Sequence, residues 1–384
     1  MRMLFVTGSL VHGGAERHTI TLANRLAERG HECHVAYIKN DPSQLARLTG
    51  AASVRCLEAR KYLDFKALGK LVGSMAEIRP AVIVAVNPYA LLYAALARRH
   101  AAPSAALMVT YHTTVPASAK EWLQMLYYRP FFWSADSLVF VCEAQRRYWN
   151  ARQLGSRRDE VIYNGVDLEH WQPRPAAERA MIRRVLGMEE GDVVVGMCAV
   201  LRPEKNHLQL VNAVARLRAL GIPARALLVG DGPERARIEA RARALGIGPE
   251  VQITGYQQDV RPLIGACDAM ALCSTAVETF SLAALEAMAL ARPVVHARLG
   301  GAAEMIRPGR DGWLFPVGDT AALVERLAAL SGRSERERLG AAAREAVETR
   351  FSERAMVDRY EATLLELESQ RSRREDLRRR AAAY

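Results

Sequence analysis

Two glutamates in one short segment, Glu278 and Glu286, offer the clearest chemistry in this sequence. Seven residues separate them, and the second falls within a run of small and apolar residues typical of a helix. We expect Glu278 to precede the helix and Glu286 to lie about two turns into it, so that both carboxylates face one cavity. The N–H groups at the helix N-terminus, around residues 280–283, would attract a phosphate. Carboxylates that bind sugar hydroxyls beside a phosphate site suit a sugar nucleotide.

Two glutamates on or near a helix are most often part of a solvated face. Here Leu282, Leu285 and Met288 leave little polar surface around Glu286. A glutamate is rarely buried without a partner or a ligand. The segment is therefore interpreted as a binding site rather than as an exposed helix.

The composition is that of an ordinary globular protein with two domains. The chain has 384 residues, of which 50% are hydrophobic and 25% charged. Residues 1–8 are typical of a strand followed by a glycine loop and lack the apolar length of a signal peptide. No apolar run approaches the roughly 20 residues that span a bilayer. The six cysteines are scattered without a Cys-x-x-Cys pair, which favours reduced thiols in a cytoplasmic protein.

The net charge of +11 is concentrated in the first half of the chain. Residues 1–187 contain 25 Lys and Arg against 15 Asp and Glu, whereas residues 188–384 contain 28 against 27. The segment 371–380 in the second half is itself rich in arginine. A basic N-terminal half could contact an anionic membrane surface, an anionic acceptor or nucleic acid, or could simply reflect a composition rich in arginine. No nucleic-acid-binding motif is present.

Strands and helices alternate along both halves of the chain. Strands are expected near 2–8, 32–38, 81–86, 105–111 and 136–142, and again near 193–200, 225–229, 251–254, 268–273, 293–297 and 312–315. This alternation predicts a doubly wound parallel sheet in each half, with ligands at the carboxyl ends of the strands. A Pro-containing stretch within 160–178 is typical of a linker. Near the C-terminus, Ser334 is expected to begin one helix through a capping box, and Ser352 to cap a longer one.

Several familiar sites are absent from the sequence. There is no Gly-x-Gly-x-x-Gly fingerprint, Walker loop, His-Glu-x-x-His or Gly-x-Ser-x-Gly motif. The Asp-x-Asp triplet that usually marks a sugar-nucleotide metal site is also missing. We therefore predict neither a metal site nor a bound cofactor.

Further candidate residues follow the strands of the second half. Arg202 and Lys205 come after the first of these strands, where their charges could neutralise a diphosphate leaving group. Gly230 ends the next strand, and Gly255 with Tyr256 ends the one after it. Glycine at these turns would let the backbone approach a base or ribose closely.

The first half contributes a second set of candidates. Gly13 and Gly14 open the first helix, where their amides could face a phosphate or a sugar. His112 ends a strand and could face the ligand, although a lone histidine is more often structural. The aromatic segment 122–133 is interpreted as core packing in preference to a membrane-facing patch.

The second half contains a series of short motifs. In chain order they are Arg202-Pro-Glu-Lys-Asn, Gly230-Asp-Gly-Pro-Glu, Glu278-Thr-Phe, Glu286-Ala-Met-Ala and Gly300-Gly with Glu304. Together they resemble those of retaining, nucleotide-sugar-dependent glycosyltransferases of the GT-B fold, the family 4 or group 1 type. The resemblance covers nearly the whole chain. It implies an α/β protein with two Rossmann-like domains facing an interdomain cleft. It also implies a C-terminal helix that crosses back to the N-terminal domain.

The resemblance implies a domain plan and a reaction. Residues 1–168 would bind the acceptor, 169–352 the nucleotide sugar, and 353–384 would form the returning helix and a basic tail. The reaction would be metal-independent glycosyl transfer from a UDP- or GDP-linked sugar to a glycan or lipid-linked acceptor hydroxyl. The expected role is polysaccharide, lipopolysaccharide or glycolipid synthesis, in the cytoplasm or at the inner membrane face.

Individual roles carry over onto matching positions. Glu286 would hold the ribose hydroxyls, Lys205 the diphosphate and Glu278 the donor sugar, and His112 would lie near the anomeric carbon. Gly13 and Gly14 would face the diphosphate or the acceptor. The backbone expected to meet sugar and phosphate is that of Phe280, Ser281 and Leu282.

The sequence departs from the family pattern at three places in the site. One is Ser274-Thr275, where the family has Pro-Ser before the Glu278 motif. Val200 stands where the family often has Arg, a charge that Arg202 could replace, and Ser281 stands where glycine is usual. Two other functions stay open at this point. One is a sugar-nucleotide epimerase built on the same plan, which would act without an acceptor. The other is a non-catalytic protein that binds a sugar nucleotide.

Overall fold

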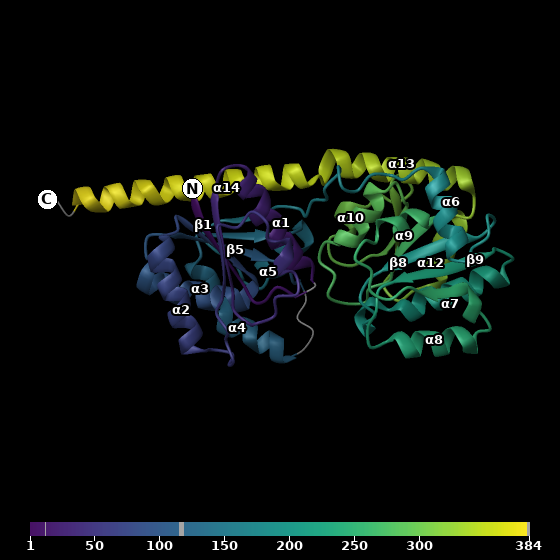
Figure 1. The fold of residues 1–384 in the computed structure, drawn as a ribbon, viewed down its shortest axis with the longest axis horizontal. Coiled ribbons are helices and arrows are strands. Elements are labelled where there is room, and N and C mark those ends of the chain that lie inside the picture. The colour runs from purple at the N-terminus through teal and green to yellow at the C-terminus, as the bar shows by residue number, and fades with distance from the viewer. Residues whose placement is uncertain (12, 115–118, 382–384) are drawn as a thin grey trace. The chain divides into compact units, whose positions relative to one another are not determined.

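The computed structural model describes residues 1–11, 13–114 and 119–381. The chain forms two compact units, which we call unit 1 and unit 2. Unit 1 comprises Met1–Tyr163 and the residues from Met356 onward, and unit 2 comprises Asn164–Ala355. Each unit has its own parallel sheet with helices on both faces (Figure 1).

Unit 1 is built on a seven-stranded sheet of order β3-β2-β1-β4-β5-β6-β7, and its described strand pairs are parallel. The central strands are buried on both faces, which explains their nearly continuous apolar sequences. The strands are β1 (Arg2–Thr7), β2 (Glu32–Tyr37), β3 (Ser53–Cys56), β4 (Val82–Val86), β5 (Ala106–Tyr111), β6 (Ser137–Phe140) and β7 (Asp159–Val161).

Two apolar clusters cover the two faces of the sheet in unit 1. One contains buried residues of α2, α3, α4 and α5, and the other contains those of α1 and α14. The helices are α1 (Gly14–Glu28), the 3-10 turn η1 (Leu45–Arg47), α2 (Phe65–Ile78), α3 (Asn87–Ala101), α4 (Ala119–Ser134), α5 (Glu143–Asn150) and α14 (Glu353–Ala381).

The aromatic segment on α4 carries apolar side chains on both its buried and its exposed side. Met125, Tyr128 and Phe132 are buried against unit 1, as the core interpretation requires. Four other apolar side chains of the helix are at least half exposed: Leu123, Leu126, Tyr127 and Trp133. The interpretation of this segment as core packing is therefore correct for the buried face of the helix and wrong for its exposed face. No helix in the described part of the chain is long and apolar enough to cross a membrane.

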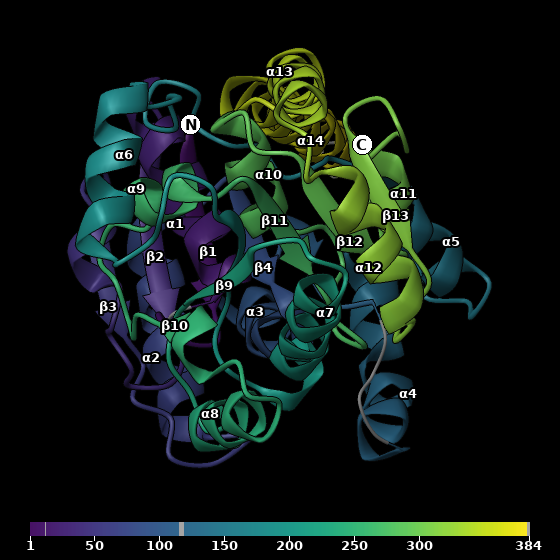
Figure 2. The same ribbon diagram turned by 90° about the vertical axis from the view of Figure 1, so that its right-hand side faces the viewer.

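Unit 2 is built on a six-stranded sheet of order β10-β9-β8-β11-β12-β13. Helices α7 and α12 lie on one side of its strands and α10 on the other (Figure 2). The strands are β8 (Val193–Cys198), β9 (Ala224–Val229), β10 (Val251–Ile253), β11 (Ala269–Leu272), β12 (Val294–Ala297) and β13 (Gly312–Phe315). The helices are α6 (Ala176–Val185), η2 (Pro203–Lys205), α7 (His207–Ala219), α8 (Arg235–Ala244), η3 (Gly248–Glu250), α9 (Arg261–Ala266), α10 (Leu282–Ala289), α11 (Ala302–Met305), α12 (Thr320–Ala329) and α13 (Arg333–Arg350).

Helix α14 follows α13 directly and packs on unit 1 from Met356 onward. Ser352 caps it, as predicted, by accepting the N–H of Ala355 at 3.2 Å. Glu361 then receives hydrogen bonds from Arg29 at 2.6 Å and from His31 at 2.7 Å. These contacts and an apolar face attach the C-terminal helix to α1 and the sheet of unit 1. The prediction of two Rossmann-like α/β domains is confirmed.

Candidate active site

The loops that follow the strands of unit 2 gather most of the predicted site residues at one edge of its sheet. Lys205 lies in the loop after β8, and Gly230 and Gly255 follow β9 and β10. Glu278 lies between β11 and α10, and Gly300 follows β12. The carboxyl edge of a parallel α/β sheet is the usual place for a ligand, because loops from several strands converge there.

Lys205 and Glu278 form an ion pair at the centre of this edge. The Lys205 Nζ donates to Glu278 Oε2 at 2.7 Å, and Ser274 Oγ donates to the same oxygen at 2.9 Å. The two loops are also joined through their backbones, because the N–H of Thr275 donates to the carbonyl of Glu204 at 2.9 Å. The Glu278 side chain is 12% exposed and that of Lys205 27%. The structure therefore brings together two residues that are 73 positions apart.

Glu278 is held in its ionised form. Burial alone would raise the pKa of Glu278, but the Lys205 ammonium, followed by His296 and the hydrogen bonds from Lys205 and Ser274, lowers that pKa below its usual range. A carboxylate that stays ionised can accept hydrogen bonds from sugar hydroxyls. It has no proton to give to a leaving group.

The start of α10 supplies free backbone donors beside this pair. Ser281 is the N-cap, and its side chain accepts the N–H of Ala284 at 3.4 Å. The carbonyl of Phe280 accepts from the Asn164 side chain at 2.9 Å, which anchors the loop just before the helix. The first N–H groups of a helix have no intrahelical partner, so the helix start at Leu282 can receive an anion. Ser281 therefore helps to build the helix terminus where the family usually has glycine.

Glu286 is a buried carboxylate on α10. It is 3% exposed, and its neighbours Ala284, Leu285, Ala287 and Met288 are buried as well. The interpretation of this segment as something other than a solvent-facing helix agrees with that burial. Its predicted contact with ribose hydroxyls stays a prediction.

Strained backbone fixes the loop that carries Glu278. Val277 has a φ of 57°, which is unfavourable for a β-branched residue. Gly300 has a φ of +55°, and a Cβ at this position would lie 2.2 Å from the Glu278 carbonyl oxygen. The next N–H, that of Gly301, donates to the carbonyl of Thr279 at 2.7 Å. The Glu278 loop is therefore pressed directly against the turn after β12.

The glycines after β9 and β10 allow close contact with neighbouring backbone as well as with a ligand. Gly230 and Gly255 form an isolated β-bridge, and each has a positive φ. A Cβ on Gly230 would lie 2.1 Å from the carbonyl oxygen of Ala199, at the start of the loop that carries Lys205. Tyr256 follows with its side chain exposed, at 63%. The sequence predicted close approach of a ligand here, and the structure adds close approach of neighbouring backbone.

Arg202 lies apart from the ion pair. Its side chain is 60% exposed, and its Nη1 is 4.0 Å from Glu204 Oε1. Val200, where the family often has Arg, is itself 43% exposed. The replacement of the family arginine by Arg202 stays a prediction.

Unit 1 carries the remaining predicted residues at the carboxyl edge of its own sheet. Gly13 is the N-cap of α1 and Gly14 its first residue. The Glu16 side chain lies over this helix start, because a Cβ on Gly13 would be 2.2 Å from Glu16 Oε2. His112 follows β5, and its backbone N–H donates to the side-chain oxygen of Asn87 at 3.0 Å.

His112 is a neutral imidazole packed against a second histidine. Its ring lies edge-on to that of His18, with centroids 4.8 Å apart, and His18 in turn contacts Tyr360 of α14. Burial lowers the pKa of His112 to about 4. A neutral His112 can donate or accept a hydrogen bond but adds no charge to a site in unit 1.

Three residues of the unit 2 site were missed by the sequence analysis: Asn164, Ser274 and His296. Ser274 belongs to the pair that replaces the family's Pro-Ser, whereas Asn164 and His296 act on the Glu278 loop from other parts of the sequence and belong to no motif named above. The only signal available was position, because Ser274 and His296 lie at the ends of strands where ligands are expected.

Comparison with known proteins identifies the family. Residues 178–346 match the sequence model described as glycosyl transferases group 1, and residues 12–170 match that of glycosyltransferase family 4. The lipopolysaccharide core biosynthesis glycosyltransferase LpsE of Rhizobium meliloti is 30% identical over 355 residues, which cover 91% of this chain and 94% of LpsE. The D-inositol 3-phosphate glycosyltransferase of Nocardia farcinica is 35% identical over 52% of this chain and 47% of its own length.

Solved structures share the fold. HepE of Anabaena, crystallised with UDP, has a TM-score of 0.86 and 23% identity, covering 95% of this chain and all of HepE. WaaG, a glycosyltransferase involved in lipopolysaccharide biosynthesis, has a TM-score of 0.71 and 17% identity, covering 93% of this chain and 98% of WaaG. With two matching family domains and a relative alignable over nearly its whole length, this chain belongs to the group 1, family 4 glycosyltransferases of the GT-B fold.

Proposed function

We propose that this protein is a retaining glycosyltransferase that moves a sugar from a nucleotide-sugar donor to an acceptor hydroxyl. The observation that carries the proposal is the Lys205–Glu278 ion pair beside the N-terminus of α10. A sugar diphosphate has one part that needs positive charge and another that needs hydrogen-bond acceptors. The ammonium and the helix amides match the diphosphate, and the ionised Glu278 matches the sugar hydroxyls.

The reaction that we propose breaks the bond between the anomeric carbon and the diphosphate oxygen. The bonding electrons stay on that oxygen, while positive charge develops on the sugar ring. The acceptor hydroxyl attacks the same face of the anomeric carbon and passes its proton to the departing diphosphate oxygen. Because Glu278 is paired with Lys205, it is unsuited to act as the nucleophile of a double displacement. This favours attack from the front face and retention of configuration.

Charge on the leaving diphosphate is the main electrostatic demand of this reaction. We propose that Lys205 and the first amides of α10 meet it, without a metal ion or a cofactor. A lysine ammonium and a helix N-terminus both stabilise phosphate anions, and in a site shielded from water each gains strength. The 12% exposure of the Glu278 side chain supports such shielding.

A nucleotide-binding experiment tests the donor site. HepE binds UDP and UDP-glucose in its crystal structures, which makes UDP the first nucleotide to test, with GDP and ADP beside it. At 100 times its dissociation constant, the preferred nucleotide should stabilise the wild type by about 2.7 kcal/mol. Glu286→Ala should lose that stabilisation, because the buried carboxylate is the proposed partner of the ribose hydroxyls. Differential scanning fluorimetry measures both.

Glu239→Ala is the control for this experiment, because Glu239 lies on α8 of unit 2 and outside the motifs that carry the family resemblance. Stabilisation that is equal in wild type and Glu286→Ala would contradict the role of Glu286. Product analysis then separates the alternatives. Conversion of the donor sugar without an acceptor would indicate an epimerase. Tight binding without turnover across acceptors would indicate a non-catalytic binding protein.

An aromatic pocket in unit 1 is our proposed acceptor site. It has a volume of about 350 Å³ and lies at the carboxyl edge of the sheet, where Asn87 and Thr113 add polar groups. Its tyrosines are Tyr62, Tyr89, Tyr111 and Tyr128. Aromatic rings with a few polar side chains suit the apolar faces and hydroxyls of a glycan.

Replacing Tyr89 should weaken acceptor binding selectively. Tyr89 contacts Tyr62 and Tyr93 at 5.2 and 5.4 Å between ring centroids. Tyr89→Ala should raise the acceptor KM by about 10-fold, because an aromatic contact of this kind contributes roughly 1 kcal/mol and the pocket loses further buried area. Steady-state kinetics with varied acceptor provide the measurement. An unchanged acceptor KM, or an equal rise in the donor KM, would contradict the assignment.

The likeness to LpsE supports a glycan or lipid-linked acceptor in polysaccharide or lipopolysaccharide synthesis. We propose that α4 brings the protein to the membrane that carries such an acceptor. Its exposed Leu123, Leu126, Tyr127 and Trp133 form an apolar surface on the more basic half of the chain.

Introducing negative charge on this surface of α4 should reduce membrane binding. The double variant Leu123→Glu with Leu126→Glu should lower co-sedimentation with phosphatidylglycerol vesicles by about 10-fold or more, because two apolar side chains are lost and two repulsive charges gained. Leu220→Glu, an equally exposed leucine in unit 2, is the control. Equal binding by both proteins would exclude α4 as the membrane contact.

A further inference from the structure

A polar cavity in unit 2 lies at the opposite edge of the sheet from the candidate active site. It has a volume of about 600 Å³ and is lined by α6, by the start of α13 and by residues just before two strands. Asp268 precedes β11 and Pro293 precedes β12, so this is the edge where the strands begin. Nothing in the proposed transfer reaction uses it.

Four arginines surround a single buried carboxylate in this cavity. Asp268 is 2% exposed and accepts hydrogen bonds from Arg179 and Arg183, while Arg336 Nε lies 3.1 Å from its Oδ1. Arg292 donates instead to the carbonyls of Leu290 and Cys267, each at 3.1 Å. Four positive charges therefore meet one negative charge. Over the whole lining, six arginines face four carboxylates.

The arginines that contact Asp268 are partly shielded from water, because their side chains are 11–30% exposed. Burial lowers the pKa of Arg179, with Arg183 and Arg336 acting in the same direction and Asp268 acting against it. Burial and Arg179 lower the pKa of Arg292 to about 10, which still leaves it charged at neutral pH. The Nε of Arg179 is buried without a hydrogen-bond partner among the residues described. The two lowered pKa values are those expected of partly buried cations.

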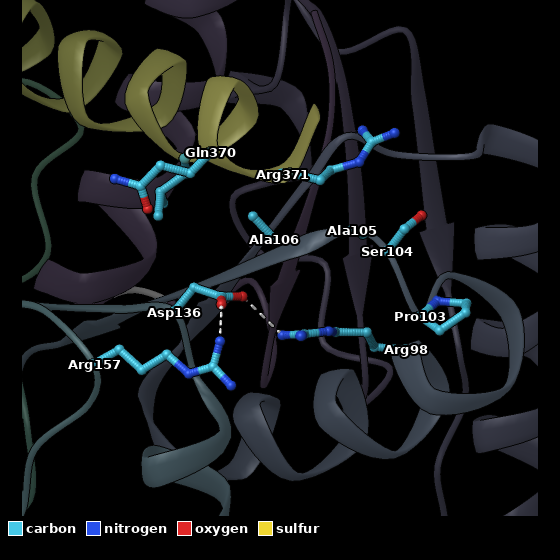
Figure 3. A pocket seen from close by; sticks show the side chains of 10 residues that line it. Arg98, Pro103, Ser104, Ala105, Ala106, Asp136, Arg157, Gln370 and Arg371 are labelled. Carbon is cyan, nitrogen blue, oxygen red and sulfur yellow. Dashed lines mark hydrogen bonds and ion pairs between the residues drawn. The ribbon is translucent and has the colours of Figure 1, made fainter. Parts of the chain in front are cut away.

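Unit 1 contains a similar carboxylate just before a strand of its own sheet (Figure 3). Asp136 precedes β6 and is 3.2 Å from both Arg98 and Arg157. It also accepts a strand N–H, from Leu107, as Asp268 does from Val194. Here the cavity has a volume of only about 110 Å³, and its third arginine, Arg371, extends away from Asp136 (Figure 3). The unit 2 cavity differs from it in its larger volume of about 600 Å³ and in the buried Nε of Arg179, which has no hydrogen-bond partner among the residues described.

We propose that the unit 2 cavity binds a phosphate-bearing anion at a site separate from the transfer site. Planar guanidinium groups match phosphate oxygens in pairs, which makes arginine the preferred residue for such recognition. A volume of about 600 Å³ is that of an ordinary small-molecule site and accommodates a diphosphate. Arg292 lies just past the C-terminus of α10, so the cavity adjoins the opposite end of the helix whose N-terminus builds the active site.

Pyrophosphate is the probe, and two substitutions on α6 test the site. Ala180 is exposed and lines the cavity, whereas Ala177 is exposed on the same helix and does not. Ala180→Glu should weaken pyrophosphate binding at least about 10-fold, because a like charge near the anion costs several kcal/mol. Ala177→Glu should bind as the wild type does. Isothermal titration calorimetry in a buffer free of phosphate measures the affinities.

Pyrophosphate held by Lys205 would not respond to either α6 substitution. Equal affinity in all three proteins, or no saturable binding to the wild type, would therefore overturn the proposal. Arg179→Gln gives a second measure, since it removes a cavity charge but leaves Asp268 its contacts with Arg183 and Arg336. It should weaken binding by a similar factor, and unchanged affinity would count against the site.

Vesicles that contain phosphatidic acid identify the source of the phosphate. If co-sedimentation falls in Ala180→Glu but not in Ala177→Glu, the cavity binds a lipid headgroup. If only pyrophosphate binding falls, the ligand is a soluble anion. If neither measurement separates the two variants, the proposal is wrong.

Discussion

Replacing Lys205 by alanine should lower kcat about 100-fold or more, because one preorganised electrostatic stabiliser is worth about 100- to 1,000-fold in rate. The ammonium is the proposed partner of the leaving diphosphate, and its charge matters most when the glycosyl bond breaks. A second effect acts in the same direction. Without Lys205, burial would raise the pKa of Glu278, since the ammonium is the main influence that lowers it. Steady-state kinetics at saturating donor and acceptor measure the loss.

Arg202→Ala is the matched control for this experiment. Arg202 lies in the same loop, but its side chain is 60% exposed and its guanidinium is 4.0 Å from Glu204. We expect a loss of only a few-fold, because an exposed ion pair contributes little. An equal loss in both variants would mean that Arg202 supplies the charge missing at Val200. Near-wild-type rates in Lys205→Ala and in Glu286→Ala would overturn the catalytic assignment.

The two sheets could be predicted because their strands are buried on both faces. Val82–Val86 and Val193–Cys198 are apolar runs of the kind that central parallel strands require. Strand β3, Ser53–Cys56, was missed because it is a half-buried edge strand with Arg55 in its middle. The capping box at Ser334 was also wrong. Helix α13 begins at Arg333 with Gly332 as N-cap, so Ser334 already lies within the helix.

The site residues could be predicted where their type and their position after a strand were sufficient to identify them. Lys205 and Glu278 were identified from residue type and position after a strand, and the structure joins them. The support around them was not predictable, because it comes from contacts between distant residues. Asn164 reaches the carbonyl of Phe280 across 116 positions. The role of Gly300 likewise depends on a backbone contact that no spacing rule contains.

Replacing Gly300 by alanine should inactivate the protein while leaving it folded. The new Cβ would lie 2.2 Å from the Glu278 carbonyl oxygen and 2.7 Å from that of Thr279, so the loop must move. A shift of about 1 Å in a catalytic group can cost about 100-fold in rate. Strain at a φ of +55° and overpacking together should reduce the free energy of unfolding by about 2–4 kcal/mol. Urea denaturation and steady-state kinetics measure the two effects.

Gly318→Ala separates strain from displacement of the loop. Gly318 has a φ of +78°, but a Cβ there would meet nothing within 4 Å. It should therefore destabilise the fold by only about 1–2 kcal/mol, from the backbone conformation alone, and leave kcat unchanged. Near-wild-type activity in Gly300→Ala would mean that the Glu278 loop tolerates movement. Strong loss of kcat in Gly300→Ala alone would instead tie turnover to the position of Glu278, because the two variants share the conformational strain and differ in what the added methyl group meets.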